Sequence, residues 1–164
     1  MKKKLMFLFF ISTILAHAKL RNVDVSKTIE KNGIVHVTKE STPFTGMVID
    51  KKDREFYTKG IPDGKWLTFY PNGKLKSIEN WKKGSLDGKY VIYRKDGTKT
   101  FETVYKEGKD NGLFKLYHDN GQLQILGMFS NGNPYGVWNY YSKEGKLTGK
   151  VNYGKKQNYF DQNN

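Results

Sequence analysis

Asp63-Gly64-Lys65-Trp66-Leu67-Thr68-Phe69-Tyr70-Pro71-Asn72-Gly73 is a stretch whose pattern returns three more times, starting at Asp87, Asn111 and Tyr135. Consecutive copies begin at one constant spacing. Aligned on their first glycine, they share aromatic residues two, five and seventeen positions later and a second glycine nine positions later. These columns are Gly64, Gly88, Gly112 and Gly136; Trp66, Tyr90, Phe114 and Trp138; Phe69, Tyr93, Tyr117 and Tyr141; Gly73, Gly97, Gly121 and Gly145; and Trp81, Tyr105, Phe129 and Tyr153. Five columns at one spacing indicate a tandem repeat array.

Each unit contains two runs of strand length separated by turn residues such as Lys95-Asp96-Gly97. Alternate positions of the second run are mostly apolar, which is typical of a half-buried antiparallel strand. The unit is therefore predicted to be a β-hairpin, with Gly97 at positive φ in its turn. The links between hairpins are too short for crossovers, so neighbouring strands must pair antiparallel. The predicted fold is all-β: an elongated antiparallel meander of tandem hairpins in a single-layer twisted sheet.

A single layer has no opposing sheet against which to bury its apolar residues. We therefore expect the aromatic columns to stack on one another and to supply the core. The repeated glycines are interpreted as turn residues, since they recur at turn offsets.

Residues 1–18 resemble a signal peptide. Lys2-Lys3-Lys4 precede an apolar run from Leu5 to Leu15, and Ala16-His17-Ala18 forms a cleavage site. The apolar run is too short to span a bilayer, so we expect an exported periplasmic or secreted protein rather than an integral membrane protein. The absence of cysteine excludes both a disulfide framework and a lipoprotein attachment site.

Residues 19–43 are predicted to be an N-terminal capping segment. It contains a hairpin turning on Asn32-Gly33, which would cover the first edge of the sheet. The repeat array follows over residues 44–156, with units starting near residues 45, 63, 87, 111 and 135. The first of these units is shorter than the others, since the next unit already begins at Asp63. Residues 157–164 form a polar C-terminal tail.

The chain carries a formal net charge of +13, and removing the signal segment takes away three lysines and no acid, which leaves +10. Counted repeat by repeat, the excess is spread along the chain and no unit is a basic stripe. Such a charge favours general attraction to anionic lipid, glycan or acidic partners. Solubility of an aromatic-rich sheet is the simpler explanation.

The sequence contains no constellation that indicates catalysis. His36 and His118 lie in different regions without Cys, Asp or Glu at ligand spacing, so no metal site and no cofactor is expected. Glu79 lies an odd number of positions after Gly64, the first glycine of its unit, and Glu102 lies an even number after Gly88. This places the two carboxylates on opposite faces of the sheet, so an acid–base pair is not indicated. We predict a non-enzyme. Spread lysines and an exported location also argue against nucleic acid as the partner.

The unit, Gly-x-aromatic-x-x-aromatic-Tyr-x-Asn-Gly-x-Leu preceded by Pro43-Phe44-Thr45-Gly46, resembles the bacterial MORN-repeat variant family over roughly residues 28–155. The resemblance implies a meandering hairpin array. It also implies an antitoxin-like role, as many members are catalogued, or a scaffold or phospholipid-binding role, as discussed for eukaryotic relatives. With an export signal, an immunity-like role against an exported toxin fits better than a cytosolic antitoxin.

Two hypotheses follow, from different classes. The first is a protein-interaction module that binds an unknown protein partner, and the second is an electrostatic binder of anionic phospholipid or cell-envelope polymer. The candidate interaction surface comprises Trp66, Phe69, Tyr93, Tyr117, Tyr135, Trp138 and Tyr141. A specific site is expected where the copies differ, at Tyr135, Lys99, Lys115 and the shortened unit after Gly46.

Overall fold

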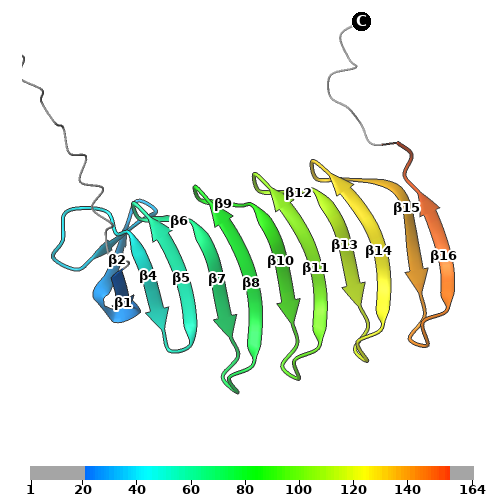
Figure 1. Ribbon diagram of the computed structural model, residues 1–164, viewed down its shortest axis with the longest axis horizontal. Helices are drawn as coiled ribbons and strands as arrows, with labels where there is room; N and C mark the ends of the chain where they lie inside the picture. The colour runs from blue at the N-terminus through cyan, green and yellow to red at the C-terminus, as the bar shows by residue number, and fades with distance from the viewer. Residues whose placement is uncertain (1–20, 156–164) are drawn as a thin grey trace, which may run out of the picture.

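The computed structural model describes residues 21–155. The predicted signal segment, residues 1–18, and the predicted tail, residues 157–164, lie outside the described residues. Within them the chain is all-β and forms one long open sheet of successive hairpins, as the repeats predict (Figure 1).

The strands follow in chain order, with one short 3-10 turn, η1. They are β1 (Arg21–Asp24), η1 (Val25–Lys27), β2 (Thr28–Lys31), β3 (Ile34–Val37), β4 (Gly46–Asp50), β5 (Asp53–Thr58), β6 (Ile61–Pro62), β7 (Gly64–Phe69), β8 (Leu75–Lys82), β9 (Ser85–Leu86), β10 (Gly88–Tyr93), β11 (Lys99–Lys106), β12 (Lys109–Asp110), β13 (Gly112–Tyr117), β14 (Leu123–Ser130), β15 (Asn133–Tyr141) and β16 (Leu147–Asn152).

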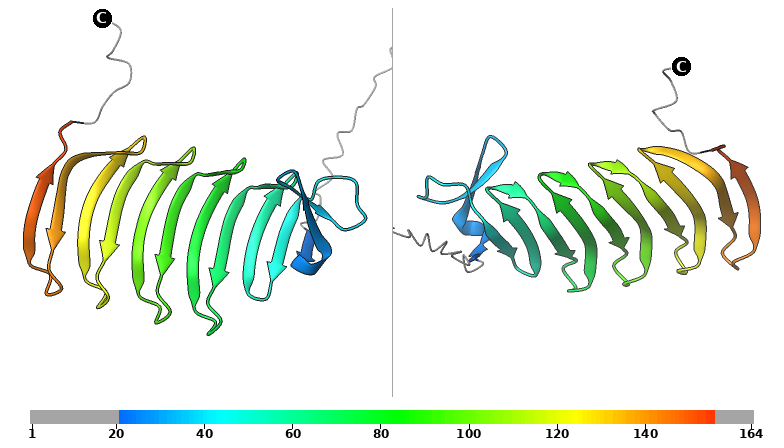
Figure 2. Two further views of the ribbon diagram at one scale, coloured as in Figure 1. Left: turned by 180° about the vertical axis from the view of Figure 1, so that it is seen from behind. Right: turned by 45° about the horizontal axis from the view of Figure 1, so that its top comes forward.

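The main sheet has the order β1-β4-β5-β7-β8-β10-β11-β13-β14-β15-β16, so sequence neighbours are sheet neighbours from β4 onward. Every pairing along this path is antiparallel except that of β1 with β4. The predicted meander is confirmed, and Figure 2 shows its hairpins side by side from two further directions.

The hairpin tips use glycine where the backbone turns left-handed. Gly97 has a φ of +97°, which confirms the predicted turn. The first glycines of the units are different, because Gly64, Gly88 and Gly112 begin strands β7, β10 and β13 rather than lie inside the hairpin turns.

The links between hairpins are themselves two-residue turns. Lys83 and Gly84 have φ values of +50° and +83°, the left-handed pair of a type I′ turn. Equivalent pairs lie at Lys59-Gly60, Glu107-Gly108 and Asn131-Gly132. After each of the first three links the chain pairs briefly with the strand it has just left, which forms β6, β9 and β12.

The N-terminal segment covers the first edge of the sheet through β1 rather than through its hairpin. β2 and β3 form the predicted hairpin on Asn32-Gly33, but it is a separate two-stranded sheet. Backbone bonds from Val35 N to Gly60 O and from Phe44 N to Val35 O hold that hairpin at the first link. The residues between β1 and β4 provide the long crossover that a parallel pair requires.

A compact apolar cluster forms at this end of the array. Val23, Phe44, Val48 and Tyr57 are buried together, and Val35, Val37 and Trp66 pack against them. The capping segment therefore closes the sheet with side chains as well as with backbone hydrogen bonds.

Candidate interaction face

One face of the sheet carries two of the three aromatic columns packed on each other. Residues directly opposite in neighbouring strands share a face, and successive residues alternate between faces. The aromatic face is defined here by the columns of Trp66 and Trp81: Trp66, Tyr90, Phe114, Trp138, Trp81, Tyr105, Phe129 and Tyr153. Ring centroids on this face lie 5.2 Å apart for Trp66 and Trp81 and 5.6 Å apart for Phe114 and Trp138. The rings pack on one another as predicted, but of the eight only Trp138 is buried. Val91, which is 1% exposed in the middle of the sheet, lies on the opposite face, so the two faces share the core.

The candidate interaction surface is consequently divided between the two faces. Trp66 and Trp138 belong to the packed aromatic face, and Trp138 is only 7% exposed. Phe69, Tyr93, Tyr117 and Tyr141 stand three residues after the Trp66 column, an odd spacing that places them on the opposite face.

The opposite face gathers the basic side chains of the strands. From β5 to β16, the charged residues that alternate onto it are all basic with the exception of Glu102: Arg54, Lys65, Lys76, Lys82, Lys89, Lys106, Lys109, Lys115 and Lys150. We call this surface the lysine face. The acids Asp53, Glu55, Glu79 and Asp110 alternate onto the aromatic face. Counting the charge of each repeat conceals this separation, because the basic and acidic residues of one strand point to opposite faces of the sheet.

Glu102 lies at the centre of a cluster on the lysine face. Its Oε2 is 2.9 Å from Lys99 Nζ and 3.2 Å from Lys89 Nζ, and its Oε1 is 3.4 Å from Lys115 Nζ. The Tyr117 hydroxyl donates a 2.8 Å hydrogen bond to the same Oε1. The cluster thus joins strands β10, β11 and β13 through one carboxylate.

Sheet register explains how these residues meet. Val91, Glu102 and Lys115 stand in one lateral row, with Lys89 two residues before Val91. Lys99 would alternate onto the aromatic face, but a bulge pairs it with Tyr93 and its ammonium group reaches Glu102. Lys99 and Lys115 are two of the positions where the copies differ, and the structure brings them together with Tyr117. Lys89 was missed by sequence reasoning, and only the alternation of residues along β10 would have indicated it.

The cluster changes the ionisation of its members. Burial raises the pKa of Glu102, but hydrogen bonds from Lys99, Tyr117 and Lys89 outweigh it and lower the pKa to about 2. Burial, followed by the hydrogen bond to Glu102, raises the pKa of Tyr117 to about 12. At neutral pH three ammonium groups therefore face one carboxylate and a neutral phenol.

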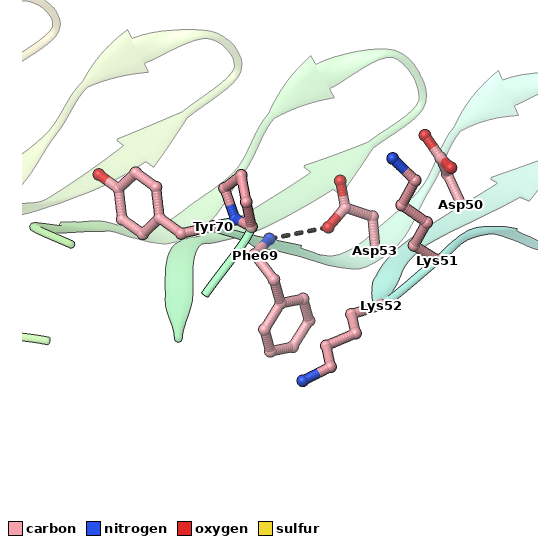
Figure 3. Close-up of a pocket in the computed structure, with 7 residues that line it drawn as sticks. Asp50, Lys51, Lys52, Asp53, Phe69 and Tyr70 are labelled. Carbon is pink, nitrogen blue, oxygen red and sulfur yellow. Dashed lines mark hydrogen bonds between the residues drawn. The ribbon is translucent and has the colours of Figure 1, made fainter. Parts of the chain in front are cut away.

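The shortened unit forms a second candidate site, at a hairpin tip (Figure 3). β4 and β5 are joined by the two residues Lys51 and Lys52, so their tip leaves a depression of about 300 Å³ beside the longer tip that follows β7. Asp50, Lys51, Lys52 and Asp53 line it together with Phe69, Tyr70 and Pro71. Asp53 Oδ1 accepts a 2.8 Å hydrogen bond from the Phe69 amide. Two acids and two bases balance here, so this site has less excess charge than the Glu102 cluster.

Tyr135 lies apart from both sites. It stands opposite Met128 near the C-terminal end of the sheet and lines a depression of about 190 Å³ with Pro134, Tyr153 and Lys155. β15 runs unbroken from Asn133 to Tyr141 in this unit.

Residues 21–155 contain no group of three or more His, Cys, Asp and Glu side chains arranged to hold a metal ion. In the same part of the chain, no helix has the length and apolarity needed to cross a membrane.

Two segments of the array match a known family model, the MORN repeat variant, at residues 62–83 and 110–131. Each match spans one hairpin, from the residues just before β7 or β13 to the link that follows β8 or β14. The chain is a MORN repeat protein. The hairpins β10–β11 and β15–β16 have the same glycine and aromatic columns and the same strand register as the two matched MORN units. No curated protein matches the chain.

Proposed function

We propose that this protein is exported and acts without catalysis as a protein-interaction module, and that partners dock on its lysine face. The MORN repeats of this array suggest a binding role. One observation carries the choice of surface. From β5 to β16, the charged strand residues on the lysine face are all basic except for the acid Glu102. Electrostatic complementarity of this kind speeds association and selects acidic partners.

The two faces differ in the groups that surround their aromatic rings. Rings of the aromatic face pack mainly on one another. The lysine face presents half-buried tyrosines between basic side chains, and tyrosine is enriched at protein interfaces because it joins an apolar ring to a polar end.

The backbone beneath the lysine face is held in place by the preceding unit. The Tyr70 hydroxyl donates to the carbonyl of Tyr93 at 2.7 Å, and Arg94 Nη2 donates to the carbonyl of Tyr117 at 2.7 Å. A surface that is already rigid loses less entropy when it binds.

An immunity-like role against an exported toxin is one form of this function. The signal segment would place such a complex outside the cytosol, and an acidic toxin surface would complement the lysine face.

Electrostatic binding of anionic phospholipid or envelope polymer is the second candidate. The same basic residues favour it, since juxtaposed lysines are each attracted to an anionic surface. It differs from the first candidate in its sensitivity to salt, because screening removes such contacts.

Affinity capture from the native envelope fraction tests the proposal, with the mature N-terminus sequenced to establish export. The wild-type protein is compared with a Lys82→Glu, Lys150→Glu variant of the lysine face. The control is a Lys95→Glu, Lys146→Glu variant, which makes the same change of net charge in the loops before β11 and β16. We expect one defined protein to be retained at about 200 mM salt by the wild type and the control and to be lost from the double variant. Release of all bound material between about 50 and 200 mM salt, with binding to anionic vesicles, would favour the lipid or polymer candidate instead.

A further inference from the structure

The Glu102 cluster holds more positive charge than its own acid neutralises. Lys89, Lys99 and Lys115 contribute three charges and Glu102 one, which leaves two in excess. The Lys89 side chain is 59% exposed and that of Lys115 is 32% exposed, whereas Glu102 is only 12% exposed. The carboxylate therefore lies beneath the lysines, and their ammonium groups remain accessible to an anion from solution.

The surface beside these cations is partly apolar. A depression of about 180 Å³ is lined by Lys89, Glu102, Thr103, Val104, Leu113 and Lys115. Leu113 is 40% exposed, and Val104 pairs with Lys89 across β10 and β11. A ligand that contacts both the lysine ammonium groups and the apolar wall must carry an anion next to an aliphatic group.

We propose that this depression is the docking point for an acidic segment of a partner protein, with a Glu or Asp carboxylate between Lys89 and Lys115 and an adjacent aliphatic side chain against Leu113 and Val104. This inference rests on the proposed function and names the chemistry of its partner. Glu102 acts as a positioning residue that gathers the three ammonium groups at one place.

A protein segment fits this site better than a bilayer does. A bilayer presents its headgroups in a plane and engages cations wherever they lie on the face. The cluster instead concentrates its excess positive charge at one depression that has an apolar wall. An Asp or Glu residue beside a Leu or Val residue matches both the charge and the wall.

Lys65 provides a matched control because the repeat places it at the position equivalent to Lys89 in the preceding unit. Both lie on the lysine face directly after their anchor glycines, but Lys89 has an ion pair with Glu102. Removing either lysine changes the net charge equally. Only Lys89→Gln changes the proposed site.

The test measures binding of the full chain to a synthetic peptide of alternating Glu and Leu residues, with Glu-Gly as the comparison peptide. Lys89→Gln and Lys115→Gln are each expected to weaken binding of Glu-Leu by about fivefold, as for the loss of one surface ion pair, and Lys65→Gln by less than about twofold. Glu-Gly should bind more weakly than Glu-Leu to the wild type. Circular dichroism of each variant checks folding, and we expect the sheet to stay intact, since these lysine side chains lie on its surface or are partly exposed.

Equal weakening by Lys65→Gln and Lys89→Gln would overturn the site in favour of diffuse attraction. Preferential retention of phosphatidylglycerol vesicles over the peptide at about 200 mM salt would assign the cluster to lipid and would also overturn it. If binding of the Glu-Leu peptide depends on Lys89 but envelope capture yields no defined protein, the docking point stands and the proposed function fails. If a defined protein is captured and Lys89→Gln retains it fully, the function stands and this docking point fails.

Discussion

At the scale of the residue, Glu102 stabilises the fold only while it is ionised. Its pKa is lowered from 4.5 to about 2 in the folded protein, where it accepts hydrogen bonds from Lys99, Tyr117 and Lys89. A carboxyl group whose pKa falls on folding contributes stability above its unfolded pKa, and this contribution is lost as the pH falls through the folded pKa.

We therefore expect the stability that depends on Glu102 to be complete above about pH 4.5 and to disappear between pH 4.5 and 2. The contribution is about 1 kcal/mol, well below the full shift, because the lysines are solvated. Urea unfolding at pH 6, 4 and 2.5 measures it. The difference between wild type and Glu102→Gln should be largest at pH 6 and clearly smaller at pH 2.5, and a constant difference would contradict the assignment.

Gly127 makes room for an aromatic ring. A Cβ atom at Gly127 would overlap the Trp138 ring, whereas a Cβ atom at Gly149 on the same face would meet nothing within 4 Å. Neither glycine has positive φ, so backbone strain does not confuse the comparison.

Gly127→Ala is expected to destabilise the protein by about 2 kcal/mol through overpacking against Trp138. Gly149→Ala should remain within about 0.5 kcal/mol of the wild type. Chemical denaturation with tryptophan fluorescence measures both. Equal stability of the two variants would show that the Trp138 ring can shift away.

At the scale of the element, the links between hairpins use a backbone conformation that their side chains do not favour equally. Lys83 and Asn131 have φ values of +50° and +51° at the same position of two of these links. Asparagine adopts left-handed φ more readily than lysine. The links hold neighbouring units together, because the amide of Gly108 donates to the carbonyl of Leu86 at 2.8 Å and Gly132 donates likewise to Asp110.

Lys83→Asn is accordingly expected to stabilise the fold by about 0.5 kcal/mol, and Asn131→Lys to destabilise it by a similar amount. Urea midpoints at pH 7 measure the two changes. Shifts in the same direction for both variants would refute the conformational explanation.

The elements also show what can be predicted from the sequence and what cannot. The period and the turn glycines determine the hairpins, because each needs only local residues. Alternation places Lys99 on the aromatic face, but the bulge opposite Tyr93 lets its ammonium group reach Glu102, and no residue type indicated that bulge. β1 pairs parallel through only four residues, and its partner depends on where the intervening chain folds.

At the scale of the whole molecule, the two ends of the sheet are unequal. Val23, Phe44, Val48 and Tyr57 are buried at the N-terminal end. β16 ends the sheet with Leu147 and Val151 exposed at 44% and 42%. Lys150 lies between them in the strand, and a charged residue of this kind discourages pairing with another chain.

Native-state hydrogen exchange should therefore report β16 as the first strand to open, followed by β15, with β10 and β11 exchanging most slowly. Among residues 21–155 no strand pairs beyond β16, and in an array whose units contact only their neighbours such a terminal unit loses its contacts at the least cost. Exchange at equal rates along the sheet would instead indicate one cooperative unit.

The hydrogen bonds between neighbouring hairpins allow the number of repeats in such a molecule to change. The same bonds recur from one unit to the next: the Tyr70 hydroxyl donates to the carbonyl of Tyr93, and the amide of Gly108 donates to the carbonyl of Leu86. Excision of residues 88–111 would bring the Tyr70 hydroxyl to the carbonyl of Tyr117 and the Gly132 amide to the carbonyl of Leu86, so that each of these two bonds is replaced by an equivalent one. The shorter chain would lack Lys89, Lys99 and Glu102. Length is thus a modular property that insertion or deletion can alter in steps of one whole repeat, while the binding chemistry belongs to one removable module.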